Sequence, residues 1–208
     1  MKLIKLAGLT LVLLGLSFSA QAQVERYVAG THYRVLDTPV RTEDSSRIEV
    51  IELFWYGCPG CYAFEPLMAN WEQNQASDID HKRLPAAWNP VTEIHAKAFF
   101  TAKSLGALDA VHDRFFEEFH ENRNRLLDEV VIRDFFESCG ISQEDFDRVF
   151  NSFSVRTMVR QAQNQVNSYG PAQTPQIYVN GKYVVTIDVG SYQEMLNVVD
   201  FLIQTERG

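Results

Sequence analysis

The chain has 208 residues, of which 46% are hydrophobic and 22% charged, and its formal net charge is -8 at pH 7. This composition is typical of a globular protein, and the length suits one hydrophobic core with an inserted subdomain better than two independent domains. An acidic surface argues against nucleic acid as a partner.

Residues 1–22 have the pattern of a secretory signal peptide. Lys2 and Lys5 precede an apolar run over residues 6–18, and the small-residue sequence AQA at 20–22 follows as a cleavage site. The apolar run is shorter than the roughly 20 residues that a membrane-spanning helix needs. We therefore expect cleavage before Gln23 and a soluble, exported mature protein.

The next elements place two cysteines at a strand-to-helix junction. The segment HYRVLD (32–37) predicts a short strand, and RIEVIELFWYG (47–57) has the nearly continuous apolar run of a strand buried on both faces. That run ends at Gly57, and apolar residues at helical spacing follow from Cys58 onward. Cys58 and Cys61 are therefore expected on the first turn of a helix.

The rest of the chain predicts a helical block between further strands. IDHKRLPA (79–86) is a strand candidate, residues 89–169 show helical patterns, and PQIYV and YVVTI flank the hairpin turn Asn180-Gly181 before a final helix. This order indicates an α/β fold with a mixed sheet. We expect one domain formed by residues 23–88 and 170–208, with residues 89–169 as an inserted helical domain.

Phenylalanines recur along the helical block, and Ser142 with Asp145 predicts a capped helix start within it. The stripes are most simply the core of the inserted domain, with a ligand pocket as the less favoured interpretation. They comprise Phe99, Phe115, Phe116, Phe119, Phe135 and Phe136.

Three cysteines cannot form a disulfide framework, so Cys58 and Cys61 are a candidate pair and Cys139 is left over. Cys139 precedes Gly140 at a predicted helix end, where a buried, unreactive thiol is the simplest interpretation. A Cys-x-x-Cys pair at a helix start suits dithiol exchange, because the helix N-terminus stabilises a thiolate and the next turn brings a resolving thiol near it.

This pattern predicts Cys58 as the nucleophile and Cys61 as the resolving cysteine. Pro59 suits the first helical position, since it has no N–H to leave unsatisfied. A zinc site would need further ligands, and neither a second Cys-x-x-Cys nor a His-x-x-x-His pair occurs, so we expect no metal and no cofactor. A purely structural disulfide is disfavoured because it would close a very short loop.

Two further features favour redox chemistry. Glu52 interrupts the apolar strand before the cysteines, where burying a charge is costly unless it has a partner or a use; a solvated position at a sheet edge is the alternative. Glu65 and Lys82 are its candidate charged neighbours. Thr174-Pro175 precedes the strand at PQIYV, and X-Pro is the bond at which a cis peptide costs least.

These residues resemble the DsbA family of periplasmic thiol:disulfide oxidoreductases. The segments IELFWYGCPGCYAFEP, RLPA and TPQIYVNGKY occur in the family's order and spacing, and the similarity covers essentially the whole mature chain. The resemblance implies a thioredoxin fold with a helical insertion, located in the periplasm. It also implies reduced exported proteins as substrates and a DsbB-like, quinone-linked membrane protein that reoxidises the dithiol.

Carried onto this chain, the family pattern implies Cys58 as the exposed nucleophile, Cys61 as the buried resolving cysteine, and Pro175 as the cis-proline beside them. It matches Glu52 to the buried acid beneath the site and Glu65 to the acid on the following helix. Lys82 is the candidate for the basic residue on the neighbouring strand.

Two positions depart from the family pattern. Gly60 stands where the family usually has histidine, which removes a donor or cation that could hold the thiolate. Thr174 stands where valine is common, and its hydroxyl could contact a sulfur atom or a substrate backbone. Both departures bear on the strength of oxidation.

The sequence leaves other functions open. A periplasmic reductase or isomerase would use the same cysteines and be kept reduced by another partner. A peptide-binding holdase would need exposed apolar surface around the site, for which the phenylalanine-rich block is the candidate. Neither the preferred substrate nor the oligomeric state is predicted.

Overall fold

A computed structural model describes residues 26–170 and 172–208. The expected signal peptide, residues 1–22, lies outside the described residues. Within those two ranges, no helix combines the length and the apolar character needed to cross a membrane.

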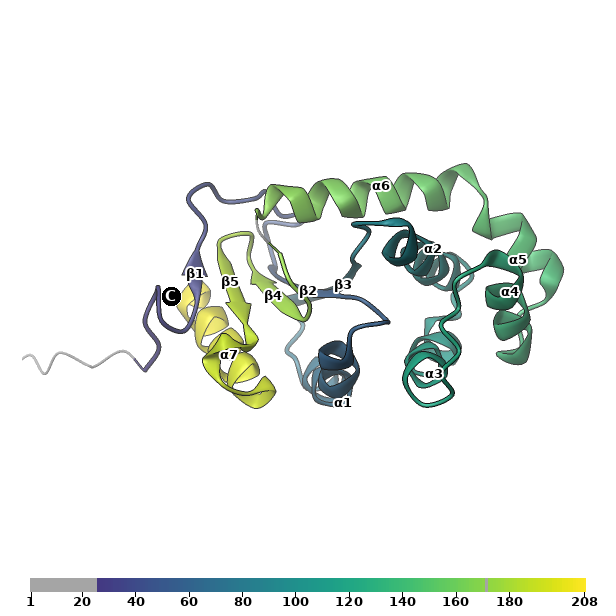
Figure 1. The fold of residues 1–208 in the computed structure, drawn as a ribbon. Helices are drawn as coiled ribbons and strands as arrows, with labels where there is room; N and C mark the ends of the chain where they lie inside the picture. The colour runs from purple at the N-terminus through teal and green to yellow at the C-terminus, as the bar shows by residue number, and fades with distance from the viewer. Residues whose placement is uncertain (1–25, 171) are drawn as a thin grey trace, which may run out of the picture.

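A five-stranded mixed sheet with the order β1-β5-β4-β2-β3 forms the centre of the molecule (Figure 1). β2 (Ile48–Phe54) pairs in parallel with β3 (Ile79–Pro85) and antiparallel with β4 (Gln176–Val179). β4 also pairs antiparallel with β5 (Tyr183–Thr186), which pairs in turn with the short β1 (Arg34–Val35). Because β2 has a neighbour on each side and helices over both faces, five of its seven residues are apolar and six of the seven are buried.

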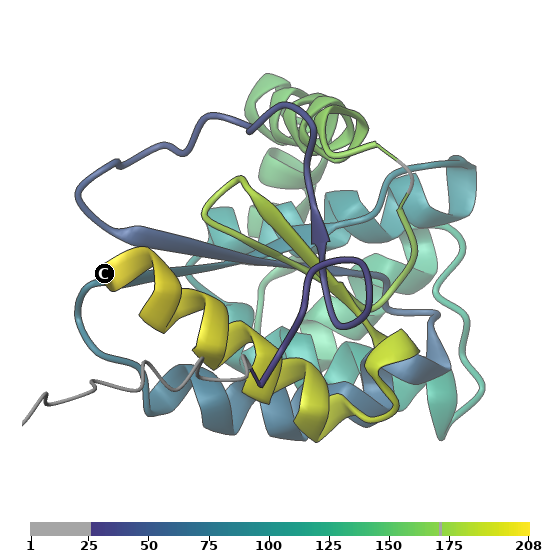
Figure 2. The ribbon, with the colours of Figure 1, turned by 90° about the vertical axis from the view of Figure 1, so that its left-hand side faces the viewer.

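Helices cover both faces of this sheet. α1 (Pro59–Gln73) and α7 (Tyr192–Arg207) lie side by side on one face, and α6 (Phe153–Ser168) crosses the other (Figures 1 and 2). Directly after α6, the ring of Tyr169 stacks on Tyr178 of β4 with 3.8 Å between ring centroids. The mixed α/β fold expected from the sequence is thus present.

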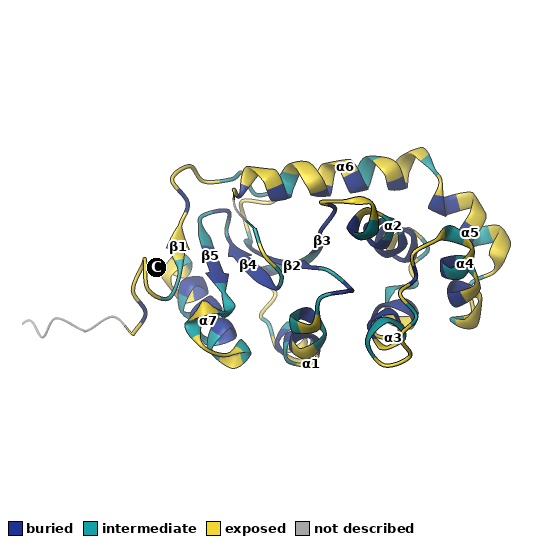
Figure 3. Ribbon diagram, viewed as in Figure 1, coloured by how far each residue is buried: buried dark blue, intermediate teal, exposed yellow. Residues whose placement is uncertain are grey.

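Between β3 and β4 the chain forms the expected block of helices. It starts with α2 (Pro90–Ser104) and α3 (Leu108–His120), and α4 (Glu129–Ser138) and α5 (Gln143–Phe150) lead into α6. The inward faces of these helices are buried (Figure 3). All but one of the predicted core phenylalanines are buried, the exception being the half-buried Phe119. They therefore form core rather than an exposed apolar surface.

The hairpin between β4 and β5 turns at Asn180 and Gly181, as predicted. Both residues have positive φ, 49° and 62° respectively, as a tight turn of this hand requires. Gly181 is needed for a second reason, because a Cβ there would lie 1.9 Å from the carbonyl oxygen of Val40. The turn thus also fixes the segment that connects β1 to β2.

Candidate active site

The local fold places Cys58 as the N-cap of α1. β2 ends four residues earlier at Phe54. Pro59 occupies the first turn of the helix, where a backbone N–H would have no partner within the helix, so the lack of this group in proline costs nothing. The Cys58 sulfur accepts a hydrogen bond from the backbone N–H of Cys61 at 3.4 Å. Both cysteines are free thiols, so the structure represents the reduced pair.

The two thiols have opposite environments. The pKa of Cys58 is lowered to about 5, chiefly by a hydrogen bond from the Cys61 thiol, which outweighs the opposing effect of burial. A hydrogen bond from the Thr174 side chain also lowers the pKa of Cys58. The carbonyl oxygen of Thr174 lies 3.2 Å from the Cys58 sulfur and accepts a hydrogen bond from its thiol form. Cys61 is fully buried, and burial raises its pKa. At neutral pH the pair therefore consists of an accessible thiolate and a buried, protonated thiol.

The loop before β4 completes the site. The Thr174–Pro175 peptide bond is cis, and Pro175 lies close to the helix start. A Cβ on Gly60 would lie 3.1 Å from Cδ of Pro175 and 3.1 Å from the hydroxyl oxygen of Tyr192. Such distances are shorter than ordinary van der Waals contact. Gly60 thus lets the helix start, the loop and Tyr192 pack together.

Tyr192 is a site residue that the sequence did not indicate. Its ring stacks on Phe64 of α1 with 5.4 Å between centroids. Burial raises its pKa, as does the negative charge of the Cys58 thiolate. Tyr192 begins the last helix, far from the cysteines in sequence, and no local motif marks it.

Beneath the cysteines, Glu52 is fully buried, which excludes the solvated alternative. Its cross-strand partner on β3 is Arg83, whose Nε lies 3.7 Å from Oε2 of Glu52. The expectation that Lys82 is the neighbouring cation is wrong. Successive side chains on a strand point to opposite faces, and the Lys82 ammonium instead contacts Glu49 at 2.7 Å and Glu43 at 2.8 Å.

Arg83 is shared among three carboxylates. Besides Glu52, it binds Glu65 at 2.8 Å and Glu72 at 2.7 Å. Burial, followed by the charge of Glu65, raises the pKa of Glu52 to about 8 in spite of Arg83. Burial also opposes ionisation of Glu65, yet His112 and Arg83 hold its pKa below the usual value. Glu52 is therefore mainly protonated at neutral pH, and Glu65 is ionised.

The reactivity of Cys58 should follow this electrostatic environment. We expect its alkylation by iodoacetamide to reach half its maximal rate near pH 5, instead of near the usual thiol pKa of about 8.5. The measurement is the rate of mass gain in the reduced protein between pH 3 and 10, with Cys61→Ser as a second sample. Since the Cys61 thiol is the main stabiliser, the midpoint of this variant should move upward. A midpoint above pH 7 in the wild-type protein would contradict the assignment.

Glu52 should make stability depend on pH. Its folded pKa, about 8, lies above the unfolded value of about 4.3, so its contribution is complete below pH 4 and is lost as pH rises through 8. Glutamine keeps the neutral form. Glu52→Gln should therefore melt several degrees above wild type at pH 9 and close to wild type at pH 4.

The buried Glu49 on the same strand provides the matched control. Its carboxylate has the ammonium of Lys82 at 2.7 Å, so Glu49→Gln removes one member of an ion pair and should lower the melting temperature at pH 9. A difference between Glu52→Gln and wild type that is the same at pH 4 and pH 9 would rule out the inferred titration.

Comparison with known proteins agrees with this geometry. Residues 81–197 match the family model of the DSBA-like thioredoxin domain. The thiol:disulfide interchange protein DsbA of Pseudomonas aeruginosa is 36% identical over 191 residues, which cover 91% of this chain and 90% of the relative. The DsbA of Pseudomonas syringae is 35% identical over 196 residues, or 94% of this chain and 90% of the relative.

Solved structures agree as well. The crystal structure of Pseudomonas aeruginosa DsbA superposes with a TM-score of 0.85 at 36% identity, covering 88% of this chain and 96% of that chain. Xylella fastidiosa DsbA gives 0.81 at 29% identity, with 87% and 98% covered. The thioredoxin-like fold with its helical insertion is therefore shared, and the chain belongs to the DsbA family of thiol:disulfide oxidoreductases.

Proposed function

We propose that this protein oxidises pairs of thiols in exported proteins by transferring the Cys58–Cys61 disulfide to them in the periplasm. The main support is the asymmetry of the two cysteines. Cys58 is partly accessible with a pKa of about 5, whereas Cys61 is fully buried with a raised pKa. A stabilised thiolate favours the reduced form of the pair, and hence donation of its disulfide.

Transfer of the disulfide takes two exchange steps. A substrate thiolate attacks the Cys58 sulfur, a mixed disulfide forms, and the Cys58–Cys61 bond breaks with its electron pair on Cys61. A second substrate thiolate then attacks the substrate sulfur of the mixed disulfide, and Cys58 leaves as a thiolate. The substrate loses two electrons and two protons; one proton stays on Cys61 and the other goes to solvent.

Glu52 supplies the proton that the first step needs. Cys61 is a poor leaving group as a thiolate, because burial raises its pKa. Glu52 is close enough to Cys61 for its charge to act on that thiol, and it is mainly protonated at neutral pH, since burial raises its pKa to about 8. We assign it as the acid that protonates Cys61, directly or through a water molecule. Arg83, not Lys82, would stabilise the carboxylate left behind.

The reaction cycle requires an oxidant that restores the disulfide. A DsbB-like, quinone-linked membrane protein is the proposed reoxidant, by similarity to the family. Export to the periplasm is supported by the predicted signal peptide at residues 1–22. Thr174 and Pro175 would contact the substrate backbone, because they border the Cys58 sulfur and belong to the loop before β4.

Single cysteine variants test these roles. Cys58→Ser should lose oxidation of a reduced, unfolded protein substrate by at least about 1,000-fold, because the attacked sulfur is gone. Cys61→Ser should instead accumulate a mixed disulfide between Cys58 and glutathione, visible by mass spectrometry. Cys139→Ser is the matched control and should keep wild-type activity, because burial raises the pKa of that thiol. Normal oxidation by Cys58→Ser would refute the mechanism.

The redox potential separates the oxidase from a reductase. With a Cys58 pKa of about 5, equilibration against glutathione should give a potential well above the about -270 mV of thioredoxin. DsbA proteins themselves are the standard example of a low cysteine pKa that accompanies a high redox potential. Gly60→His should move the potential further upward by adding a donor near the thiolate, and Gly60→Ala controls for crowding. A potential at or below that of thioredoxin would favour the reductase alternative.

A further inference from the structure

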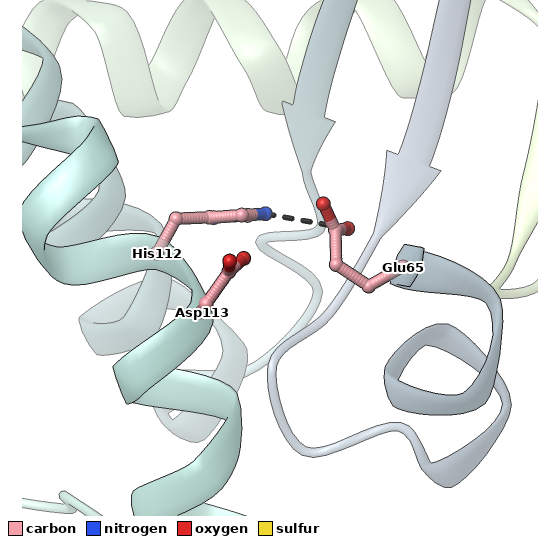
Figure 4. A group of neighbouring side chains, drawn as sticks. All are labelled: Glu65, His112 and Asp113. Atoms are coloured by element: carbon pink, nitrogen blue, oxygen red, sulfur yellow. Dashed lines mark ion pairs between the residues drawn. The ribbon is translucent and has the colours of Figure 1, made fainter. Parts of the chain in front are cut away.

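Three potential metal ligands meet where α1 faces α3 (Figure 4). Glu65 extends from α1, and His112 and Asp113 extend from consecutive positions on α3. Each residue offers a nitrogen or oxygen atom within 4.8 Å of the others. Nε2 of His112 and Oε2 of Glu65 point toward one another across 3.4 Å.

Two of these atoms are buried without a hydrogen-bond partner. Glu65 is 6% exposed and His112 is 7% exposed. Within the described residues, neither Oε2 of Glu65 nor Nε2 of His112 makes a hydrogen bond; the two atoms face each other in an ion-pair contact at 3.4 Å. Buried polar atoms nearly always have a hydrogen-bond partner, since leaving one without a partner is costly. A cation between the two atoms would pair both.

The spacing matches a zinc coordination shell. Ligand atoms about 2.1 Å from a tetrahedral zinc lie about 3.4 Å apart, which is the observed separation of the His112 and Glu65 atoms. Asp113 is exposed, so a change of rotamer can bring its carboxylate into the shell. One imidazole with two carboxylates suits zinc and its substitute cobalt better than calcium, which prefers oxygen ligands alone.

Neighbouring residues hold the two buried ligands in the required form. The hydroxyl of Tyr56 lies 2.8 Å from Nδ1 of His112. If Nδ1 donates its proton to that hydroxyl, Nε2 keeps a free lone pair directed at Glu65. Arg83 binds the other oxygen of Glu65, Oε1, and leaves Oε2 available.

The local charge and space also allow a cation. Glu65, Glu72 and Asp113 provide three carboxylates, against the guanidinium of Arg83 that Glu65 and Glu72 share and the imidazole of His81, which contacts Glu72 at 3.0 Å. The three ligands also line a cavity of about 450 Å³ between α1 and α3. This space gives a metal ion access and leaves room for water as the fourth ligand.

We propose that Glu65, His112 and Asp113 form a binding site for a divalent zinc-like cation that links α1 to α3. Glu65 also belongs to the charge network around Glu52 through Arg83, but the metal site does not depend on the proposed function. A metal bound there ties the helix that carries Cys58 and Cys61 to the helical insertion. Because it binds only when both helices are in place, it stabilises the folded state.

The test uses the full mature protein in its oxidised form, so that Cys58 and Cys61 are unavailable as zinc ligands, with Cys139→Ser as background. We expect calorimetric titration with zinc chloride to show one saturable site per chain and zinc to raise the melting temperature. Asp113→Asn should weaken zinc binding at least tenfold, and it should leave the fold intact because Asp113 is exposed. His112→Asn, which can still contact Tyr56, should abolish binding.

Asp109→Asn is the matched control, because Asp109 is an exposed acid on the same helix and lines the same cavity without belonging to the cluster. It should leave the zinc affinity unchanged. With cobalt, the imidazole protons of His112 should show paramagnetic shifts in the NMR spectrum. The proposal fails if the oxidised protein shows no saturable zinc binding, or if Asp113→Asn binds zinc as tightly as Asp109→Asn.

Discussion

The backbone N–H of Cys61 donates to the Cys58 sulfur at 3.4 Å, and the chemistry of the site depends on the negative charge that this geometry favours. The contact exists because β2 ends just before the cysteines and α1 begins at Pro59, so Cys58 becomes the N-cap. The partial positive charge of the helix N-terminus and the hydrogen bond from the Cys61 thiol both stabilise the Cys58 thiolate. Everything that fixes this junction therefore supports the thiolate.

The charges below the junction explain how Cys61 can remain neutral beside a thiolate. Arg83 is shared by Glu65 and Glu72 at short distances, and it lies farther from Glu52 at 3.7 Å. Burial and the charge of Glu65 outweigh the more distant Arg83, so Glu52 keeps its proton to about pH 8. A protonated Glu52 adds no negative charge near Cys61, where such a charge would add to the repulsion from the Cys58 thiolate. The same proton is the one that exchange requires.

Local patterns predicted the parts of the fold and site that depend on neighbours in sequence. The strand-to-helix junction at Cys58, the hairpin at Asn180 and the buried phenylalanines follow from apolar periodicity and turn chemistry. Arg83 was missed in favour of Lys82 because the register of two parallel strands is set by the whole sheet. A shift of one residue places the side chain on the other face.

Tyr192 and His112 show a second limit of sequence patterns. Tyr192 meets Gly60 only through the packing of α7 against α1, and His112 meets Glu65 only through the placement of α3. The spacing of residues along the sequence does not predict such contacts. The cluster of Glu65, His112 and Asp113 likewise matches no spacing motif, because its members come from two helices that are far apart in sequence.

The helical insertion also has a direct part in shaping the cysteine loop. Trp55 donates through Nε1 to Nδ1 of His95 at 3.0 Å, and burial lowers the pKa of His95 to about 4, so that it stays a neutral acceptor. The Tyr56 hydroxyl contacts His112, and the Tyr56 carbonyl accepts from Nε2 of His120 at 2.8 Å. Histidines of α2 and α3 thus hold both residues that precede Gly57 and the cysteines. Because these contacts fix where β2 gives way to α1, the insertion helps to set the geometry on which the Cys58 thiolate depends.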